Sequence, residues 1–149
     1  MSSELENDFL VLLYDVARQM RTRADQMART YGMTRAQWGI LARLEKQPGL
    51  SQNELAALAE TAPITIARLV DRLEEQGLVE RCPDPQDRRV WRLRLTAKAA
   101  PHLQHIKRYR AELRALMTKD LEPEVLEAMA LGLRKMKDNL HLPLSKACA

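Results

Sequence analysis

The 149-residue sequence is poor in aromatic residues, glycine and cysteine, and these shortages restrict what the chain can be. Aromatic residues make up 4% of the chain and hydrophobic residues 46%, so a core must consist mainly of leucine, alanine, methionine, valine and isoleucine. That composition favours helices over sheets. No apolar run approaches the ~20 residues of a membrane helix, and acidic residues stand near the N-terminus where a signal peptide would be basic. We expect a cytoplasmic protein with no membrane partner.

Motifs for catalysis and metal binding are also missing from the sequence. It contains no Gly-rich phosphate loop, no G-x-S-x-G and no H-E-x-x-H. The two cysteines, Cys82 and Cys148, lie far apart and form no C-x-x-C pair, which argues against a disulfide framework or a zinc site. We therefore expect no enzyme, no cofactor and no metal. The net charge of +4 is mild, so the positions of the charges matter more than their number.

A long helix is predicted at the N-terminal end of the chain. Ser3–Glu6 has the S-x-x-E form of a capping box. Apolar residues then recur at three- and four-residue steps from Phe9 to Tyr31, and Gly32 suits the end of the helix. At ~1.5 Å per residue the helix would be about 40 Å long, more than one small core requires. Its length suggests a partner chain.

The middle of the sequence predicts a helix-turn-helix. Thr34–Gln37 and Ser51–Glu54 are two further capping boxes, and the second opens a short helix with Leu55 and Leu58 facing inward. A tight turn at Glu60-Thr61 leads to the next helix, which has Pro63 in its first turn and ends at Gly77. Its N-terminal cap is predicted to be Thr61, because Ala62 has no polar side chain. Two short helices joined in this way form a helix-turn-helix.

A hairpin and two further helices complete the predicted fold. Residues 78–82 and 90–96 form two strands around the loop "PDPQDRR", and Trp91, Leu93 and Leu95 alternate with arginines as in a half-buried strand. Thr96 can cap the following helix, in which Pro101 marks a kink or a later start. Each terminal helix carries an apolar stripe, and a two-fold dimer would bury these stripes. The fold is mainly α with a small β wing, divided into a dimerisation helix (1–33), a winged helix-turn-helix DNA-binding domain (34–96), C-terminal dimerisation helices (97–142) and a flexible tail (143–149).

Positive charge is concentrated where such a fold meets DNA. The second helix of a helix-turn-helix enters the major groove, where arginine can bond guanine, and Thr or Ile can touch a thymine methyl group. Arginines at a hairpin tip can enter the minor groove, and Asp87 can hold a neighbouring arginine extended. The candidate DNA contacts are Ser51, Gln52, Pro63, Ile64, Thr65, Arg68, Arg72, Asp87, Arg88, Arg89 and Arg92. The alternatives are a solvated helix face, since the helix also carries Asp71, Glu74 and Glu75, and arginines that keep an exposed edge strand soluble.

Several stretches resemble the MarR/SlyA family of bacterial transcription regulators. They are "LSQNELAALAE", "ARLVDRLEEQGLVER" and "DPQDRRVWRLRLTAKA", and the resemblance extends from about Asp8 to Leu140. It implies a homodimer that binds a palindromic operator, mostly as a repressor, and is released by a small, often aromatic, acid. Arg68 matches the family's recognition-helix arginine and Arg89 its minor-groove arginine. Ala62 departs from the usual polar cap, and Ala99 and Pro101 from the usual glycine after the wing.

The effector site is predicted on the same resemblance, between the winged helix and the dimerisation helices. The residues that could line it are Tyr14, Arg18, Met20, Trp38 and His102. An apolar pocket with one cation suits an aromatic carboxylate, although Trp38 and Met20 could instead be core residues. Oxidation of Cys82 in the wing, or a metal on His102 and His105, are alternative signals. A winged helix that binds a protein is a further alternative, disfavoured by the charged hairpin tip.

Overall fold

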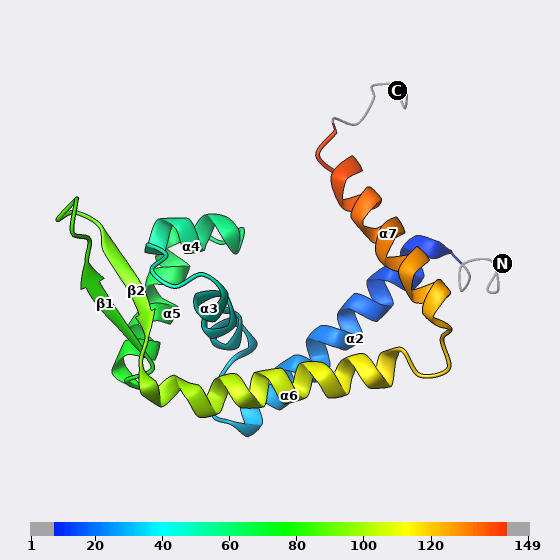
Figure 1. The fold of residues 1–149 in the computed structure, drawn as a ribbon, viewed down its shortest axis with the longest axis horizontal. Coiled ribbons are helices and arrows are strands. Elements are labelled where there is room, and N and C mark those ends of the chain that lie inside the picture. The colour runs from blue at the N-terminus through cyan, green and yellow to red at the C-terminus, as the bar shows by residue number, and fades with distance from the viewer. Residues whose placement is uncertain (1–7, 143–149) are drawn as a thin grey trace. The chain divides into compact units, whose positions relative to one another are not determined.

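A computed structural model describes residues 8–142 of the chain. They divide into two compact units, of which the first ends at Tyr109 and the second begins at Arg110. The helices and strands, labelled as in Figure 1, are α2 (Phe9–Thr30), α3 (Arg35–Lys46), α4 (Gln52–Leu58), α5 (Pro63–Glu75), β1 (Val79–Pro83), β2 (Trp91–Leu95), a 3₁₀ turn (Ala97–Ala99), α6 (Ala100–Met117) and α7 (Pro123–Asn139). The mainly helical fold with a two-stranded wing is therefore as predicted. The functional division of the chain at residues 33 and 96 stays a prediction.

Side chains cap the helix starts largely as the sequence predicts. Both bonds of the capping box form at Thr34 and Gln37, and again at Ser51 and Glu54. The long helix α2 begins later than expected, because the Asp8 carboxylate accepts the Leu10 N–H at 2.8 Å and starts the helix at Phe9. The predicted capping box at residues 3–6 lies outside the described residues.

Neither predicted threonine cap forms a side-chain bond to its helix, although Thr96 occupies the N-cap position of the 3₁₀ turn. Ala62 is the N-cap of α5 and gives it no side-chain bond, while the Thr61 hydroxyl donates to the Ala59 carbonyl at 3.0 Å. Thr96 precedes the 3₁₀ turn, but its hydroxyl donates to the Gly77 carbonyl at 2.6 Å. Each hydroxyl has a nearby carbonyl acceptor and does not cap the helix that follows it. Pro101 lies in the first turn of α6, where its missing N–H costs no helical bond.

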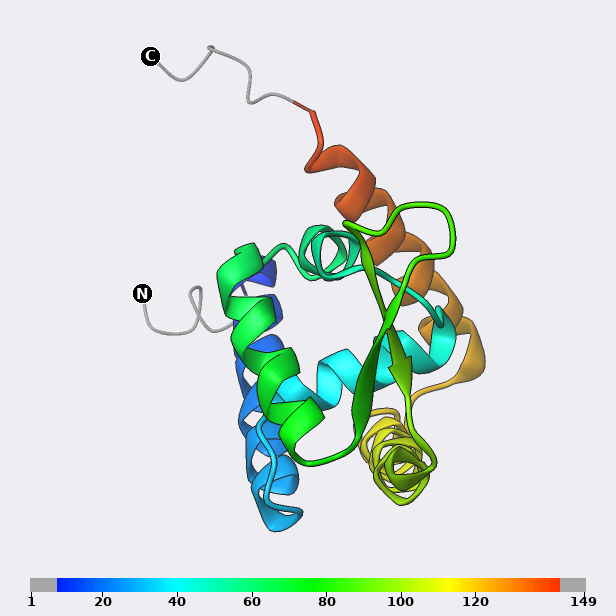
Figure 2. The same ribbon diagram turned by 90° about the vertical axis from the view of Figure 1, so that its left-hand side faces the viewer.

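Gly77 ends α5 and sets the direction of the wing. Its φ is +73°, a left-handed conformation that side chains disfavour. The Gly77 N–H bonds the Glu74 carbonyl at 2.8 Å, and the Leu78 N–H bonds the Leu73 carbonyl at 2.9 Å, which is the Schellman pattern. Leu78 is thereby buried. In Figure 2 the end of α5 leads directly into β1.

The hairpin is antiparallel, with Val79 opposite Leu95 and Arg81 opposite Leu93.

The core of the unit containing residues 8–109 holds buried side chains from α2, α3, α4, α5, both strands and the start of α6. Two residues predicted to face inward are exposed, Leu58 by 44% and Trp91 by 50%. Leu58 is the last residue of α4, and Trp91 pairs with Pro83 at the outer end of the hairpin, beyond the buried Leu93.

Apolar side chains lie exposed on α2 and on α7. On α2 they are concentrated in the N-terminal half, where Phe9 is 51% and Tyr14 is 74% exposed. All 17 residues of α7 are described and none of them is buried. Among the described residues, no helix is both long and apolar enough to cross a membrane. Isolated apolar residues on a surface are ordinary, but a contiguous series marks a surface that contacts another molecule.

Candidate nucleic-acid interface

Helix α5 presents an exposed face with two arginines. Ile66, Val70 and Leu73 are buried in the core. The predicted contact residues are all exposed, namely Pro63, Ile64, Thr65, Arg68 and Arg72. Within the described residues, Arg68 and Arg72 form no ion pair with an acidic side chain. This face therefore offers guanidinium groups that the fold does not use.

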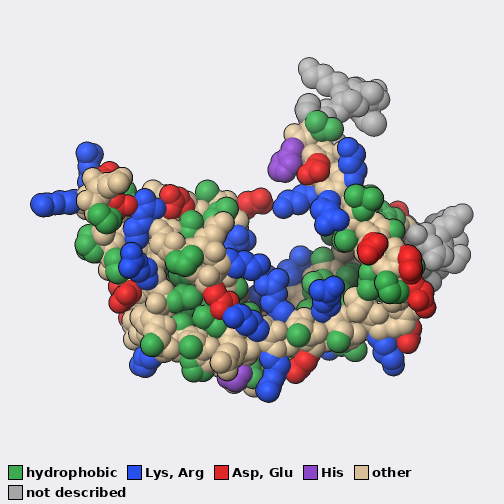
Figure 3. Space-filling model, viewed as in Figure 1, with side chains coloured by type: hydrophobic (Ala, Val, Ile, Leu, Met, Phe, Trp, Pro, Cys, Tyr) green, Lys and Arg blue, Asp and Glu red, His purple; other side chains and the backbone are tan. Residues whose placement is uncertain are grey.

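A tight turn at the end of the hairpin presents two more arginines. The Asp84 carboxylate accepts the N–H groups of Gln86 and Asp87 at 2.7 and 3.0 Å, which closes the turn. Arg88 and Arg89 follow, and both are exposed. Figure 3 shows Lys and Arg side chains projecting from this end of the hairpin. The hairpin tip is thus a small, strongly basic surface.

Asp87 holds Arg89, as the sequence analysis predicts. Its carboxylate accepts the Arg89 backbone N–H at 3.0 Å, and the side-chain Nε lies 3.7 Å from the same oxygen. The Arg89 side chain is nevertheless 93% exposed, so the pair leaves its remaining guanidinium donors free. The carboxylate orients the arginine without covering it.

Arg92, one of the candidate DNA contacts, is engaged within the fold. Its Nε donates to Asp84 at 2.6 Å and its Nη1 donates to Glu54 at 2.8 Å, so the side chain links the hairpin to α4. Only 31% of the side chain is exposed. The guanidinium is engaged within the chain because two carboxylates from other elements converge on it.

Both carboxylates beside Arg92 have lowered pKa values. The pKa of Asp84 is below its ordinary value of 3.8, chiefly because Arg92 donates a hydrogen bond to it, and next because the N–H groups of Gln86 and Asp87 do so. The pKa of Glu54 is below 4.5, first through the N–H of Ser51 and then through Arg92. All of these donors favour the charged carboxylates.

The lowered pKa values predict a loss of stability in acid. A carboxyl group whose pKa is lower in the folded state stabilises the fold above its unfolded pKa, and this stabilisation is lost as the pH falls through the folded value. We expect the free energy of unfolding, measured with urea, to decline as the pH falls below about 4.5. Asp84→Asn should make this decline shallower. An unchanged decline in that variant would contradict the role given to Asp84.

Ser51 and Gln52 are also engaged within the fold. The Ser51 hydroxyl accepts the Glu54 N–H at 3.2 Å, and the Gln52 side-chain oxygen accepts from Nε of Arg81 at 2.8 Å. Both residues are half-buried at the start of α4. The bonds leave Gln52 its amide N–H donors and Ser51 its hydroxyl proton.

Arg81 is the residue of this region that the sequence analysis missed. It lies on β1 and contacts Asp71 and Glu74 of α5 as well as Gln52 of α4. The available signal was strand alternation, because Arg81 lies two residues after the buried Val79 and so on the inward side of the strand.

The predicted effector residues do not come together in the described structure. Trp38 is buried and its ring lies 5.9 Å from that of Tyr31, at the C-terminal end of α2. Tyr14 is roughly 25 Å further along the same helix, at ~1.5 Å per residue. Met20 is 39% exposed, and Arg18 is paired with Asp15 at 2.6 Å. Trp38 and Met20 were the two residues that could instead belong to the core. Trp38 does belong to it, whereas Met20 does not.

Three residues of α3 and α6 each have a buried polar atom without a hydrogen-bond partner. Trp38 Nε1, His102 Nδ1 and Tyr109 Oη are buried and form no hydrogen bond within the described chain. Burial, followed by the nearby His105, lowers the pKa of His102 below its ordinary value of 6.5. His102 also lines a hollow of about 300 Å³ at the end of α5, together with Tyr31, Gly32, Met33, Gln76, Leu78 and Lys98. It is the one predicted effector residue that reaches this hollow.

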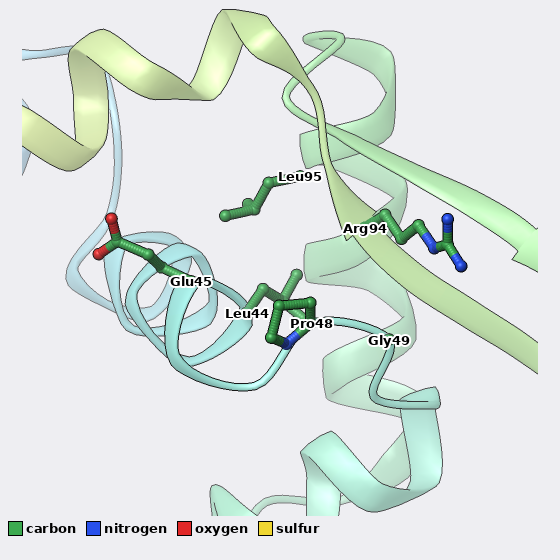
Figure 4. Close-up of a pocket in the computed structure, with 6 residues that line it drawn as sticks. All are labelled: Leu44, Glu45, Pro48, Gly49, Arg94 and Leu95. Carbon is green, nitrogen blue, oxygen red and sulfur yellow. The ribbon is translucent and has the colours of Figure 1, made fainter.

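A second hollow, of about 390 Å³, lies between the end of α3 and β2 (Figure 4). Leu44, Pro48 and Leu95 give it an apolar lining. Arg94 points away from it in Figure 4, and Glu45 is paired with Lys107 at 2.6 Å.

The residues of the alternative signals are placed as follows in the described structure. Cys82 is half-buried and free, whereas Cys148 lies outside the described residues. Among residues 8–142, no three His, Cys, Asp or Glu side chains are grouped as a metal site would require. His105 is instead stacked on Tyr31, with ring centroids 4.0 Å apart.

Known proteins resemble this chain in sequence and in fold. The sequence profile of the MarR family matches residues 31–90. The uncharacterised HTH-type transcriptional regulator YybA of Bacillus subtilis is 30% identical over 92 residues, which are 62% of this chain and 61% of YybA. MepR of S. aureus, solved as a complex with DNA, is 26% identical with a TM-score of 0.79, covering 91% of this chain and 99% of MepR. The transcriptional regulator SlyA is 26% identical with a TM-score of 0.80, covering 90% of this chain and 94% of SlyA.

Proposed function

We propose that the chain is a transcription regulator of the MarR family and not an enzyme, and that it binds double-stranded DNA. One observation carries the proposal. Helix α5 and the hairpin tip both expose arginines, and the fold leaves these arginines free or, at Arg89, only oriented by a neighbouring carboxylate. The similar protein MepR, whose structure was solved on DNA, supports the same reading. The proposal includes a cytoplasmic location, where a bacterial regulator meets its DNA.

In this proposal α5 enters the major groove and the hairpin tip enters the minor groove. Arg68 bonds guanine O6 and N7 through its two parallel donors, while Ile64 and Thr65 contact thymine methyl groups. Arg89, held extended by Asp87, lies in the narrow minor groove with Arg88 beside it. The uncapped N-terminus of α5 lies toward a phosphate.

We further propose that the protein is a homodimer on a palindromic operator, and a repressor. The exposed apolar side chains of α2 and of α7 support the dimer, since a second copy would remove them from water. Two copies related by a two-fold axis would place two α5 helices on two half-sites of opposite orientation.

The proposed signal for release is a small carboxylic acid, often an aromatic one in this family. The support is the family resemblance, together with the unpartnered polar atoms near Trp38 and His102. Tyr14 could take part only from another copy of the chain, because α2 holds it far from Trp38.

Arg68→Ala is expected to change sequence preference. Loss of a bidentate contact to guanine costs about 1–3 kcal/mol and relaxes the preference at one base pair in each half-site. Selection from a randomised operator library with the wild type and the variant would show it. Arg43→Ala, which removes an exposed arginine from α3, is the control. Identical preferences for Arg68→Ala and the wild type would remove Arg68 from the base-reading residues.

Selection of genomic fragments by the purified protein tests the proposed function directly. The best fragment is then titrated at several salt concentrations. We expect a palindrome with half-sites about one helical turn apart and an affinity that falls steeply with salt. Failure to enrich any sequence, with weak and equal binding to all fragments, would count against an operator-binding regulator.

A further inference from the structure

Acidic side chains interrupt the basic surface of α5. Asp71 and Glu74 lie on the helix that is proposed to enter the major groove, and their side chains are 58% and 42% exposed. DNA phosphates repel carboxylates over distances comparable with the Debye length, about 10 Å at 0.1 M salt. Left unpaired, these two carboxylates would oppose the binding for which Arg68 and Arg72 are placed.

One guanidinium group forms ion pairs with both carboxylates. Arg81 Nη2 lies 2.5 Å from the Asp71 carboxylate, and its Nη1 forms a second ion pair with Glu74. The backbone N–H of Arg81 also donates to Glu74, at 3.3 Å. The Arg81 side chain is only 20% exposed, so it lies between the helix and the hairpin and does not face solvent as Arg88 and Arg89 do.

A third contact holds the guanidinium in this position. Its Nε donates to the Gln52 side chain of α4 at 2.8 Å. An arginine has five donors in a planar fork and can serve three acceptors at once, whereas a lysine would offer one point charge. Arg81 therefore joins β1, α4 and α5, and its charge remains next to the two acidic residues.

We propose that Arg81 partly masks the acidic side of α5, so that Asp71 and Glu74 repel DNA less than they would without it. It acts through these carboxylates and does not touch DNA itself. The inference rests on the proposed function, because it concerns the same α5 surface. Beyond that function, we infer that the charge which α5 presents to DNA depends on Arg81, a residue of strand β1 in the stem of the hairpin.

The test compares four proteins on the selected operator: the wild type, Arg81→Gln, the pair Asp71→Asn with Glu74→Gln, and all three substitutions together. Arg81→Gln is expected to bind roughly tenfold more weakly, since it exposes two like charges to the phosphates. This deficit should shrink as salt rises, because added salt screens the repulsion. The triple variant should bind within about threefold of the Asp71/Glu74 pair, because the repelling charges are gone.

Glu75 provides a matched control on the same helix. It is exposed and forms no ion pair within the described residues, so Arg81 does not mask it. Glu75→Gln should change the affinity by the same factor with Arg81 present or replaced, whereas the Asp71/Glu74 pair should have its main effect when Arg81 is replaced.

Three outcomes would overturn the inference. Arg81→Gln could bind as tightly as the wild type, the triple variant could stay as weak as Arg81→Gln, or the deficit could be independent of salt. Thermal unfolding distinguishes masking from a merely structural role of Arg81. The triple variant and Arg81→Gln lack the same ion pairs and so the same stabilisation, but only the triple variant should regain DNA binding. If Arg81→Gln does not fold, the variant with Asp71→Asn and Glu74→Gln is measured alone. It must bind DNA at least as tightly as the wild type, and weaker binding would overturn the inference. A wild type that binds no DNA would instead defeat the proposed function.

Discussion

Replacing both hairpin-tip arginines, Arg88 and Arg89, with alanine is expected to weaken DNA binding by roughly a hundredfold or more, and equally for all sequences. The two side chains are exposed at the tip, and charged hydrogen bonds are each worth about 1.5–3 kcal/mol. A minor-groove arginine senses groove width and potential and reads bases poorly, so the loss should not change the preferred operator.

The salt dependence gives this prediction a second measurement. The slope of log K against log salt falls by about 0.9 for each phosphate charge no longer neutralised, and a dimer has two hairpin tips. Titrations at several salt concentrations should therefore give a clearly shallower line for the double variant. The pair Lys119→Ala and Lys135→Ala, which removes two exposed charges from residues 110–142, should leave the line unchanged. A wild-type slope in the Arg88/Arg89 variant would rule out contact between the hairpin tip and DNA.

Charges placed in the apolar stripe of α2 are expected to give monomers that bind the operator more than a hundredfold more weakly. Leu13 and Val16 are 39% and 45% exposed and lie three residues apart on one face of α2. Aspartate at both positions would have to be buried without partners in a dimer, at a cost of several kcal/mol. A monomer would hold one half-site only, and so would lose the gain from binding two linked half-sites.

Sedimentation measures the oligomeric state, and titration of the palindrome measures its consequence. The control pair is Gln19→Asp with Gln26→Asp, which adds the same charge to the polar face of α2. It should remain dimeric and bind normally. A Leu13/Val16 variant that sediments as a dimer, or a wild type that sediments as a monomer, would contradict the proposed dimer.

Much of the local structure follows from short stretches of sequence. The capping boxes at Thr34 and Ser51 form because each uses groups only three residues apart. Gly77 ends α5 because glycine adopts a left-handed conformation without strain. The exposure of Arg68 follows in the same way, since helical periodicity sets it opposite the buried Ile66 and Val70. The fold class and the exposed arginines of α5 and the hairpin tip were therefore predictable.

The tertiary structure alone decided which arginines remain free. Arg81 and Arg92 look like Arg88 and Arg89 in the sequence, but they bond Gln52 and Glu54, 29 and 38 residues away along the chain. Helix and strand periodicities describe only near neighbours, so they could not show that carboxylates of α4 and α5 converge on the hairpin stem. The same limit explains why Thr61 was predicted as a cap and why five effector residues were grouped although α2 holds Tyr14 far from Trp38. Local chemistry sets the elements and their exposed faces, and packing between distant segments determines which charges are neutralised within the fold.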